Sequence, residues 1–207
     1  ISWRVAIEDG IRQLITTLRQ VRGHGDIARF LLARLFYNDG LVTLFAVGGI
    51  YAKTTFGMTT AEVLQFGVGI NVTAGLGAFA FAWIDDWIGS KRTILISLAG
   101  LIIVAAGVLS AETTLAFLIW GSALGIFVGP VQAASRSMMA HLAPQGLETE
   151  MFGLFAFSGK ATAFIGPLVF AAVTALTASQ RWGMATILVF FAAGGALLFT
   201  VTDARRG

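Results

Sequence analysis

The chain has 207 residues, of which 57% are hydrophobic and only 12% are charged, whereas a soluble domain carries about 25% charged residues. A mean hydropathy of +0.82 points the same way, and a soluble protein of this size could not bury so much apolar surface. The chain has no cysteine, which excludes disulfides, thiolate metal sites and cysteine nucleophiles. The net charge of +3 calls for no nucleic-acid partner, because the basic residues follow the membrane topology predicted below.

Residues 1–25 predict a separate element, a basic amphipathic helix. Arg12, Arg19 and Arg22 alternate with apolar residues that recur at spacings of three and four: Ile7, Ile11, Leu14, Ile15, Leu18 and Val21. We expect this helix to lie along the inner membrane surface; the alternative is that it packs on another cytoplasmic segment. The chain begins without an initiator methionine, which we interpret as the sign of a fragment.

Six apolar segments follow, each long enough to cross a bilayer, which takes about 20 residues. They are expected at about residues 27–52, 61–85, 92–111, 113–139, 151–177 and 182–202. Their apolar runs are continuous rather than alternating, which favours helices over membrane strands. The sequence therefore predicts an all-α membrane protein in which residues 26–207 form one domain of six transmembrane helices, with no room for a soluble domain.

The connections between the segments carry typical helix-end residues. Asp26 can cap the first span, and Thr59 or Thr60 can cap the second with Glu62 in its first turn. Gly89 and the serine after it predict a tight loop after the second span.

The basic residues predict the orientation. If the N-terminus lies inside, all 14 Lys and Arg residues except Lys53 and Arg181 fall on or toward the inner side. Positive residues favour the cytoplasmic side of a membrane. We therefore expect both termini in the cytoplasm and place the protein in a bacterial inner (plasma) membrane.

The loop after the second span resembles the signature loop of the major facilitator superfamily. It has an acidic residue, a glycine and a basic pair in the expected order: Asp86, Gly89, Lys91 and Arg92. The sequence departs from that signature at Ala82, where a glycine is usual, and at Trp87, where a basic residue is usual. A short topogenic hairpin without further function is the alternative interpretation.

Three more segments narrow the resemblance: residues 36–40 (FYNDG), 129–137 (GPVQAASRS) and 148–167 (ETEMFGLFAFSGKATAFIGP). Together they are similar to the vacuole-effluxer-like branch of the superfamily, whose best-known members export amino acids after autophagy. The resemblance covers the second half of that family, spans seven to twelve. It implies a 3+3 inverted repeat of helices and a substrate path between two six-helix halves.

Polar side chains inside the spans are the candidate substrate or coupling residues, because such groups are costly in lipid and usually face a cavity or a partner. They are Asn38, Asp39, Asn71, Gln132, Arg136 and Lys160. The third and sixth spans contain no ionisable residue. In the resembled family these two helices are the outer ones, so we expect them to face lipid.

Asp39 and Lys160 are predicted at similar depth, near the middle of the first and fifth spans. We expect them to form an ion pair that lines the cavity. In one interpretation, protonation of Asp39 or a substrate charge breaks the pair during transport. In the other, the pair is static and only locks two helices together.

Two other polar residues have open interpretations. Asn71 shares a helix face with Gly67 and Gly75, a stripe that favours close helix packing, with substrate contact as the alternative. Arg136 is expected to bind a carboxylate of the substrate or of Glu148 or Glu150, or else to snorkel to the interface. Two Gly-Pro pairs are expected to bend their helices: Gly129, Pro130, Gly166 and Pro167.

The predicted function is that of half a secondary active transporter, which moves a small solute, amino acids by resemblance, by alternating access with proton coupling through Asp39. A six-helix binding subunit, or a homodimeric half-transporter or scaffold without transport of its own, is the alternative. The expected partners are the lipid bilayer, a small-molecule substrate, and either the missing N-terminal six-helix half or a second copy of the chain. No enzyme activity is expected, because neither His24 nor His141 follows Ser158 in the order of an intramembrane serine protease. No cofactor and no metal are expected.

Overall fold

The computed structural model describes residues 25–202, and the amphipathic helix expected in residues 1–25 falls almost wholly outside them. Between residues 25 and 202 the chain is helical, with short turns and no strand. The helices are α2 (Gly25–Phe56), α3 (Thr60–Ile88), α4 (Ser90–Ser110), α5 (Thr114–Leu142), α6 (Glu148–Ala161), α7 (Ile165–Thr177) and α8 (Gln180–Phe199). They form six segments long and apolar enough to cross a membrane. The prediction of an all-α protein with six membrane spans is confirmed.

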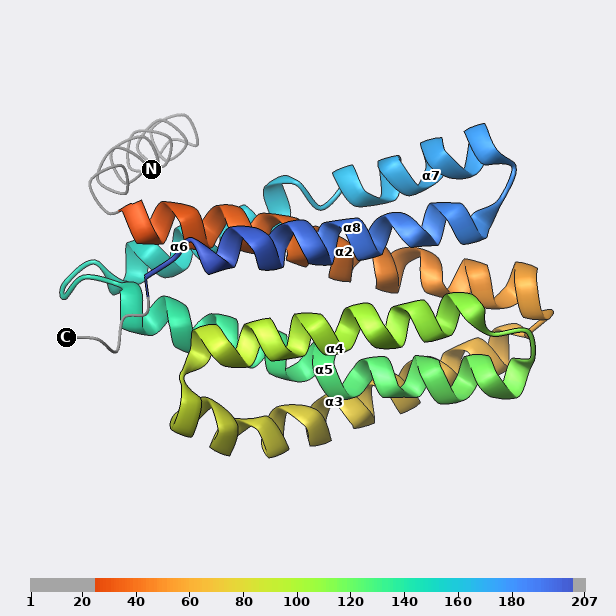
Figure 1. Ribbon diagram of the computed structural model, residues 1–207, viewed down its shortest axis with the longest axis horizontal. Helices are drawn as coiled ribbons and strands as arrows, with labels where there is room; N and C mark the ends of the chain where they lie inside the picture. The colour runs from red at the N-terminus through yellow and green to blue at the C-terminus, as the bar shows by residue number, and fades with distance from the viewer. Residues whose placement is uncertain (1–24, 203–207) are drawn as a thin grey trace, which may run out of the picture.

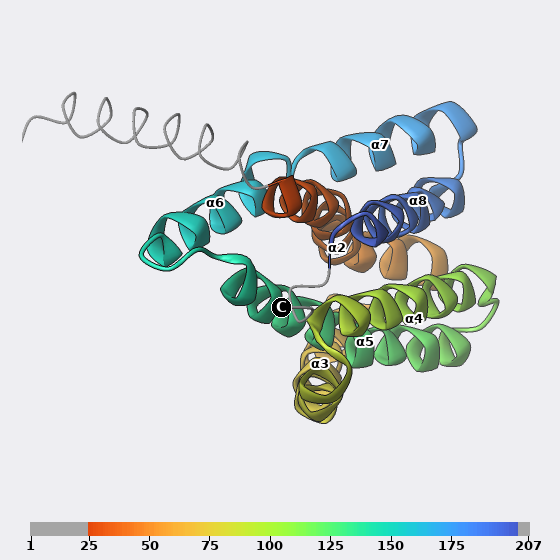
Figure 2. The ribbon, with the colours of Figure 1, turned by 60° about the vertical axis from the view of Figure 1, so that its left-hand side comes forward.

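The helices run along one long axis (Figure 1). α2 packs against α8, α3 against α5, and α4 against both α5 and α8. In Figure 2, α3 lies at one edge of the bundle and α6 and α7 at the opposite side. α3 and the α6–α7 segment are the least buried spans, whereas α4 and α8 are well covered by their neighbours. Burial within this half does not test the expectation that the third and sixth spans face lipid, because a partner half could cover α3 and the α6–α7 segment.

Helix ends follow the local sequence signals. Thr59 caps α3: its hydroxyl accepts the backbone N–H of Glu62, while Glu62 Oε2 accepts the N–H of Thr59 at 2.7 Å. This reciprocal pair satisfies two N–H groups that the helix itself cannot use. Gly89 alone joins α3 to α4 at φ 90°, a conformation that glycine adopts without a Cβ penalty.

The closest helix contact joins α3 and α5. A Cβ at Gly77 would collide with the Ile126 carbonyl, and Gly125 and Gly129 lie against the backbone around Ala74. In a regular helix the Ile126 carbonyl would accept a hydrogen bond from the N–H of residue 130. Pro130 has no N–H, so this carbonyl makes no such bond and lies directly against Gly77. The small residues thus let the two backbones touch.

The Gly67–Asn71–Gly75 stripe does not make this contact. A Cβ at Gly67 or Gly75 would meet nothing within 4 Å, and Asn71 is exposed. Within residues 25–202 no helix packs closely on this stripe; the close contact uses the neighbouring face of α3, which carries Thr73, Ala74 and Gly77.

The fifth span is two helices rather than one. α6 ends at Ala161, a turn covers residues 162–164, and α7 begins at Ile165. Pro167 lies in the first turn of α7, where its missing N–H costs little, but it cannot donate to Ala163 as a continuous helix would require. The break therefore falls just before Gly166-Pro167. The other expected bend, at Gly129-Pro130, lies inside α5, which continues without interruption to Leu142.

Candidate functional site

The broken fifth span is held from the side by α2. Asp39 is buried, and its Oδ2 accepts a hydrogen bond of 2.8 Å from the backbone N–H of Gly166 in the first turn of α7. Asp39 lies about 21 Å from the start of α2 and about 26 Å from its end, so it sits near the middle of this span. A carboxylate at a helix N-terminus satisfies a free N–H and complements the helix dipole.

Thr43, one turn farther along α2, completes this contact. Its hydroxyl donates to the Asp39 carbonyl at 2.7 Å and lies so close to Gly166 that a Cβ there would collide with it. Gly166 is therefore required for the approach of α7 to α2. The other carboxylate oxygen, Asp39 Oδ1, is buried and has no hydrogen-bond partner among residues 25–202.

Two donors of α2 hold the end of α6. Asn38 Nδ2 donates to the Gly159 carbonyl at 2.9 Å, one of the last four carbonyls of α6, which have no donor within the helix. Arg34 Nη1 donates to the Phe155 carbonyl at 2.7 Å and to Ser158 Oγ at 3.1 Å. α2 thus presents donors and a cation to the negative end of α6 and an anion to the positive end of α7, as the helix dipoles favour.

A hydrogen bond between buried hydroxyls ties α2 to α5 at the same level. Tyr37 and Ser135 lie 2.7 Å apart at their hydroxyl oxygens, and Ser135 donates its own hydrogen to the Val131 carbonyl. Tyr37 is therefore the donor to Ser135. This bond fixes the separation of α2 and α5 beside the break.

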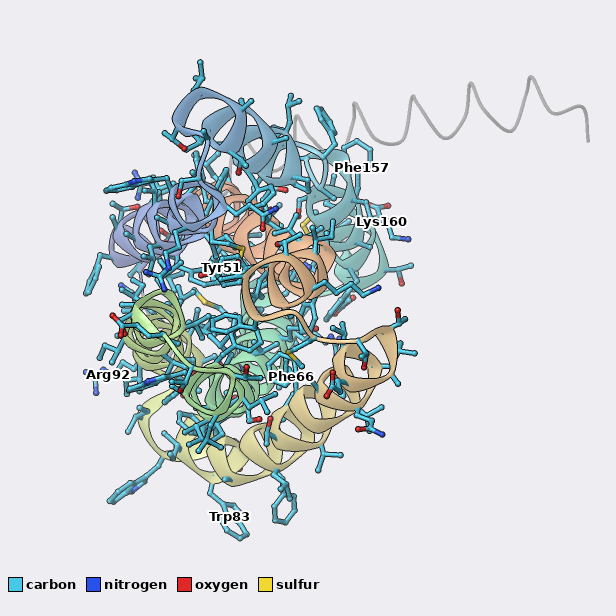
Figure 3. The ribbon with its side chains drawn as sticks, turned by 90° about the vertical axis from the view of Figure 1, so that its right-hand side faces the viewer. Tyr51, Phe66, Trp83, Arg92, Phe157 and Lys160 are labelled. Atoms are coloured by element: carbon cyan, nitrogen blue, oxygen red, sulfur yellow. The ribbon has the colours of Figure 1, made fainter. Side chains whose placement is uncertain are left out.

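The expected ion pair between Asp39 and Lys160 is wrong. Asp39 is buried against Gly166, whereas Lys160 in the last turn of α6 is exposed and points away from the bundle (Figure 3). Asp39 and Lys160 form no ion pair with each other. Lys160 lies on the exposed side of α6, while the partner of Asp39 is a backbone N–H that becomes available where α7 begins.

The remaining predicted residues do not join the cluster around the break. Asn71 is exposed and donates to the Gly67 carbonyl of its own helix at 2.8 Å. Gln132 and Arg136 are exposed on one face of α5, four residues apart. The expected bond of Arg136 to Glu148 or Glu150 is not formed within the described residues.

The signature loop lies at the end of the bundle where α2 starts and α8 ends. Lys91 donates to the carbonyls of Phe199, at 3.1 Å, and Val201. Arg92 is exposed beside it, and Asp86 is at the end of α3. A lysine at a helix C-terminus satisfies carbonyls that the helix leaves free, so the loop holds the end of α8.

Sequence reasoning missed six residues of the site: Arg34, Tyr37, Thr43, Ser135, Phe155 and Ser158. Phe155 packs beneath Arg34, whose Cζ lies 3.6 Å from the ring centroid. Tyr37 could have been found, because a tyrosine inside a span needs a partner for its hydroxyl. Hydroxyls that bond their own helix are common in spans, so Thr43 and Ser135 gave no separate signal.

The site offers binding groups rather than a reaction centre. It combines a buried carboxylate, an amide and a guanidinium with a helix break in mid-span, and residues 25–202 hold no group of three potential metal ligands. Interrupted helices of this kind form solute and ion sites in transporters, because their ends expose free backbone groups at the membrane centre.

Comparisons with known proteins agree with this architecture. A family model described as "Vacuole effluxer Atg22 like" matches residues 1–207. "Uncharacterized MFS-type transporter YxiO" of Bacillus subtilis (strain 168) is 26% identical over 94% of this chain and 45% of its own length. "Autophagy-related protein 22" of Candida glabrata is 28% identical over 88% of this chain and 36% of its own length. The protein of the same name from Coccidioides immitis is 26% identical over 100% of this chain and 36% of its own length. The chain spans less than half the length of each of these relatives, and it belongs to the vacuole effluxer Atg22-like family of transporters.

Proposed function

We propose that the chain is the six-helix half of a secondary transporter that moves small solutes, amino acids among them, by alternating access. The observation that carries this proposal is the contact of Asp39 with the N-terminus of α7 near mid-span. A helix break and a buried carboxylate in the middle of a membrane both cost free energy. A protein that served only as a scaffold would gain nothing from them. A transporter uses such a break to present polar groups to its solute.

Proton coupling through Asp39 is part of this proposal. When Asp39 is ionised, its charge stabilises the free N–H groups at the start of α7. When it is protonated, the charge is lost and the hydrogen bond to Gly166 weakens, which frees α7 to move relative to α2. A proton gradient would thereby shift the equilibrium between a state in which α7 is held against α2 and a state in which it can move.

Uptake into proteoliposomes tests the proposal. We expect the wild-type transporter, which comprises this chain and the second six-helix half proposed below, to accumulate radiolabelled amino acids when a proton gradient is imposed, and to lose that accumulation when the gradient is collapsed. Asp39→Asn keeps an oxygen that can accept from Gly166 but cannot bind a proton, so it should abolish gradient-driven accumulation. Asp26→Asn, at the membrane end of the same helix, is the control and should leave accumulation unchanged. Accumulation by Asp39→Asn equal to wild type would exclude Asp39 as the coupling group.

We further propose that a second six-helix half completes the cavity. The relatives that this chain matches are more than twice its length, which supports a partner half within a longer protein over a second copy. The least buried spans, α3 and α6–α7, offer the faces for it. Asn71 lies on such a face, and a polar side chain in mid-span favours a partner or water over lipid.

Cross-linking distinguishes the two partners. These 207 residues contain no cysteine, so Asn71→Cys gives this half a single reactive site. Oxidation of purified Asn71→Cys should yield no disulfide-linked dimer if a different half covers α3, whereas a second copy packed symmetrically on α3 would give an efficient dimer. Val189→Cys, at an exposed position of α8, is the control and measures how much disulfide-linked dimer forms by random collision.

For orientation, we propose that the end of the bundle with Arg29, Lys91 and Arg92 faces the cytoplasm of a bacterial cell. Lys53 and Arg181 lie at the opposite end, where they donate to Thr60 Oγ1 and the Ala111 carbonyl. In intact cells a membrane-impermeant thiol reagent should label Lys53→Cys and not Arg92→Cys. The reverse labelling would overturn this orientation.

A further inference from the structure

A small apolar pocket lies between α2 and α3, toward the end of the bundle where α2 ends and α3 begins. It has a volume of about 140 Å³, and every side chain that lines it is apolar. Phe66 of α3 and Phe117 of α5 form an aromatic wall, with their ring centroids 5.2 Å apart. An apolar protein cavity of about 150 Å³ stays dry and holds a benzene molecule. The pocket therefore matches a phenyl ring or a branched aliphatic group in size and in chemistry.

Two glycines, one on each of these helices, leave the space open. Gly48 of α2 and Gly67 of α3 line the pocket, yet a Cβ at either would meet nothing within 4 Å. Gly121 of α5 is different, because a Cβ there would collide with the Phe66 ring; this glycine lets Phe66 lie against α5. Glycine inside a helix lowers stability, and neither Gly48 nor Gly67 permits a close contact that would offset the loss. What their missing side chains provide is room in the pocket.

The pocket opens on the side of α3 that faces away from lipid. A stripe of large apolar side chains runs along the opposite face of the helix, as their positions at 3.6 residues per turn require. Each of them is more than half exposed: Val68, Val72, Leu76, Phe79, Trp83 and Trp87. Trp83 points away from the bundle, whereas Phe66 lies within it (Figure 3). Tryptophan is typical of the membrane interface, so this stripe is the one that meets lipid, and an acyl chain is not the natural occupant of the pocket.

The same side of α2 carries polar groups and the pocket in succession. Arg34, Asn38, Phe45 and Gly49 recur at spacings of four, seven and four, so they share one helix face. Arg34 and Asn38 contact α6 beside the helix break, and Phe45 and Gly49 line the pocket. Asn38 and Phe45 are about 10 Å apart along the helix axis. A solute with a polar head and a bulky apolar side chain matches this succession, whereas a sugar or an inorganic ion would lose hydration in the pocket without replacing it.

We infer that the pocket receives the apolar side chain of the transported solute, and that Gly48 and Gly67 set the size of the side chain that it accepts. Phe66 and Phe117 supply the surface on which a ring can stack. The inference rests on the proposed function, because it assumes that the chain handles a solute. The binding step itself can be measured without transport.

Competition binding tests the preference for size. The complete transporter, this chain with its second half, is placed in phosphatidylcholine nanodiscs with radiolabelled phenylalanine, and unlabelled glycine, alanine, leucine and phenylalanine compete. Affinity should rise at least about tenfold from alanine to leucine or phenylalanine, since each buried methylene group adds about fourfold. Equal affinity for alanine and phenylalanine, or no binding of phenylalanine, would overturn the inference.

Variants identify the two glycines as the determinants. Gly48→Val and Gly67→Val place a branched side chain in the open space, so the affinity for phenylalanine should fall at least about tenfold while that for alanine stays as in wild type. Gly67→Ala adds less volume and should give a smaller loss in the same direction. Gly69→Val is the matched control: its Cβ also meets nothing within 4 Å, but the residue does not line the pocket, so binding should not change.

Other occupants give different results. If an acyl chain or a side chain of the second half fills the pocket, Gly48→Val and Gly67→Val should change lipid retention or the unfolding temperature and leave the preference among amino acids as in wild type. Such an unchanged preference, or equal losses for alanine and phenylalanine, would overturn the assignment. Size-graded binding without gradient-driven uptake would overturn the proposed function alone. Uptake that treats alanine and phenylalanine alike in wild type and in both valine variants would overturn the pocket alone.

Discussion

Asp39 Oδ2 accepts the backbone N–H of Gly166 at 2.8 Å, across 127 residues of sequence. The bond joins the middle of α2 to the start of α7, where the fifth span is interrupted. It gives one side chain two roles: it satisfies a backbone group that the break exposes, and it places an ionisable group near the middle of the span.

Substitutions of Asp39 should separate the acceptor from the charge. Asp39→Leu removes the acceptor and leaves the Gly166 N–H buried without a partner, which costs about 1–3 kcal/mol. Asp39→Asn retains an acceptor oxygen and should destabilise the protein less. Thermal unfolding in detergent measures both. Equal losses for the two variants would mean that the hydrogen bond contributes little.

Gly166 should tolerate no side chain while Thr43 is present. Gly166→Ala places a methyl group against Thr43 Oγ1, and such overpacking costs about 1–3 kcal/mol. Thr43→Ala removes the obstructing atom, so the double variant should recover part of the loss. A double-mutant cycle of unfolding free energies measures this coupling, and additive effects would contradict the contact.

The hydrogen bond from Tyr37 to Ser135 should contribute only modestly to the free energy of unfolding, although both hydroxyl groups are buried. Interhelical hydrogen bonds in membranes contribute about 0.6 kcal/mol on average and at most about 1.7 kcal/mol. The cycle of Tyr37→Phe and Ser135→Ala isolates the bond, because Ser135 also bonds its own helix. A coupling energy of zero would show that α2 and α5 are held by packing alone.

The α3–α5 contact should depend on particular glycines. Gly125→Ala adds a methyl group that meets the Ile70 carbonyl and the Ala74 nitrogen, both backbone atoms that cannot turn aside. It should lower the unfolding temperature clearly. Gly67→Ala on the open face of α3, where a Cβ meets nothing within 4 Å, should not. Comparable losses in both variants would indicate a general effect of removing glycine from a span.

Several features of this protein depend only on residues that are close together in the sequence. Hydropathy over about 20 residues is enough to define a span, so the six spans could be predicted. The Thr59–Glu62 cap and the turn at Gly89 depend on residues next to each other, and both are found as expected. Pro167 indicated that the fifth span would bend.

What the tertiary structure decided is which distant groups meet. A pattern along one helix shows that Asp39 needs a partner, but not whether the partner is Lys160 or the N–H of Gly166, because that depends on the rotation and depth of another helix. In the folded chain Gly166 meets Asp39, and Lys160 lies exposed on α6. The same holds for the glycines of α3: periodicity singled out Gly67 and Gly75, while the contact with α5 falls on Gly77, since helix rotation within the bundle is set by the packing of all its neighbours.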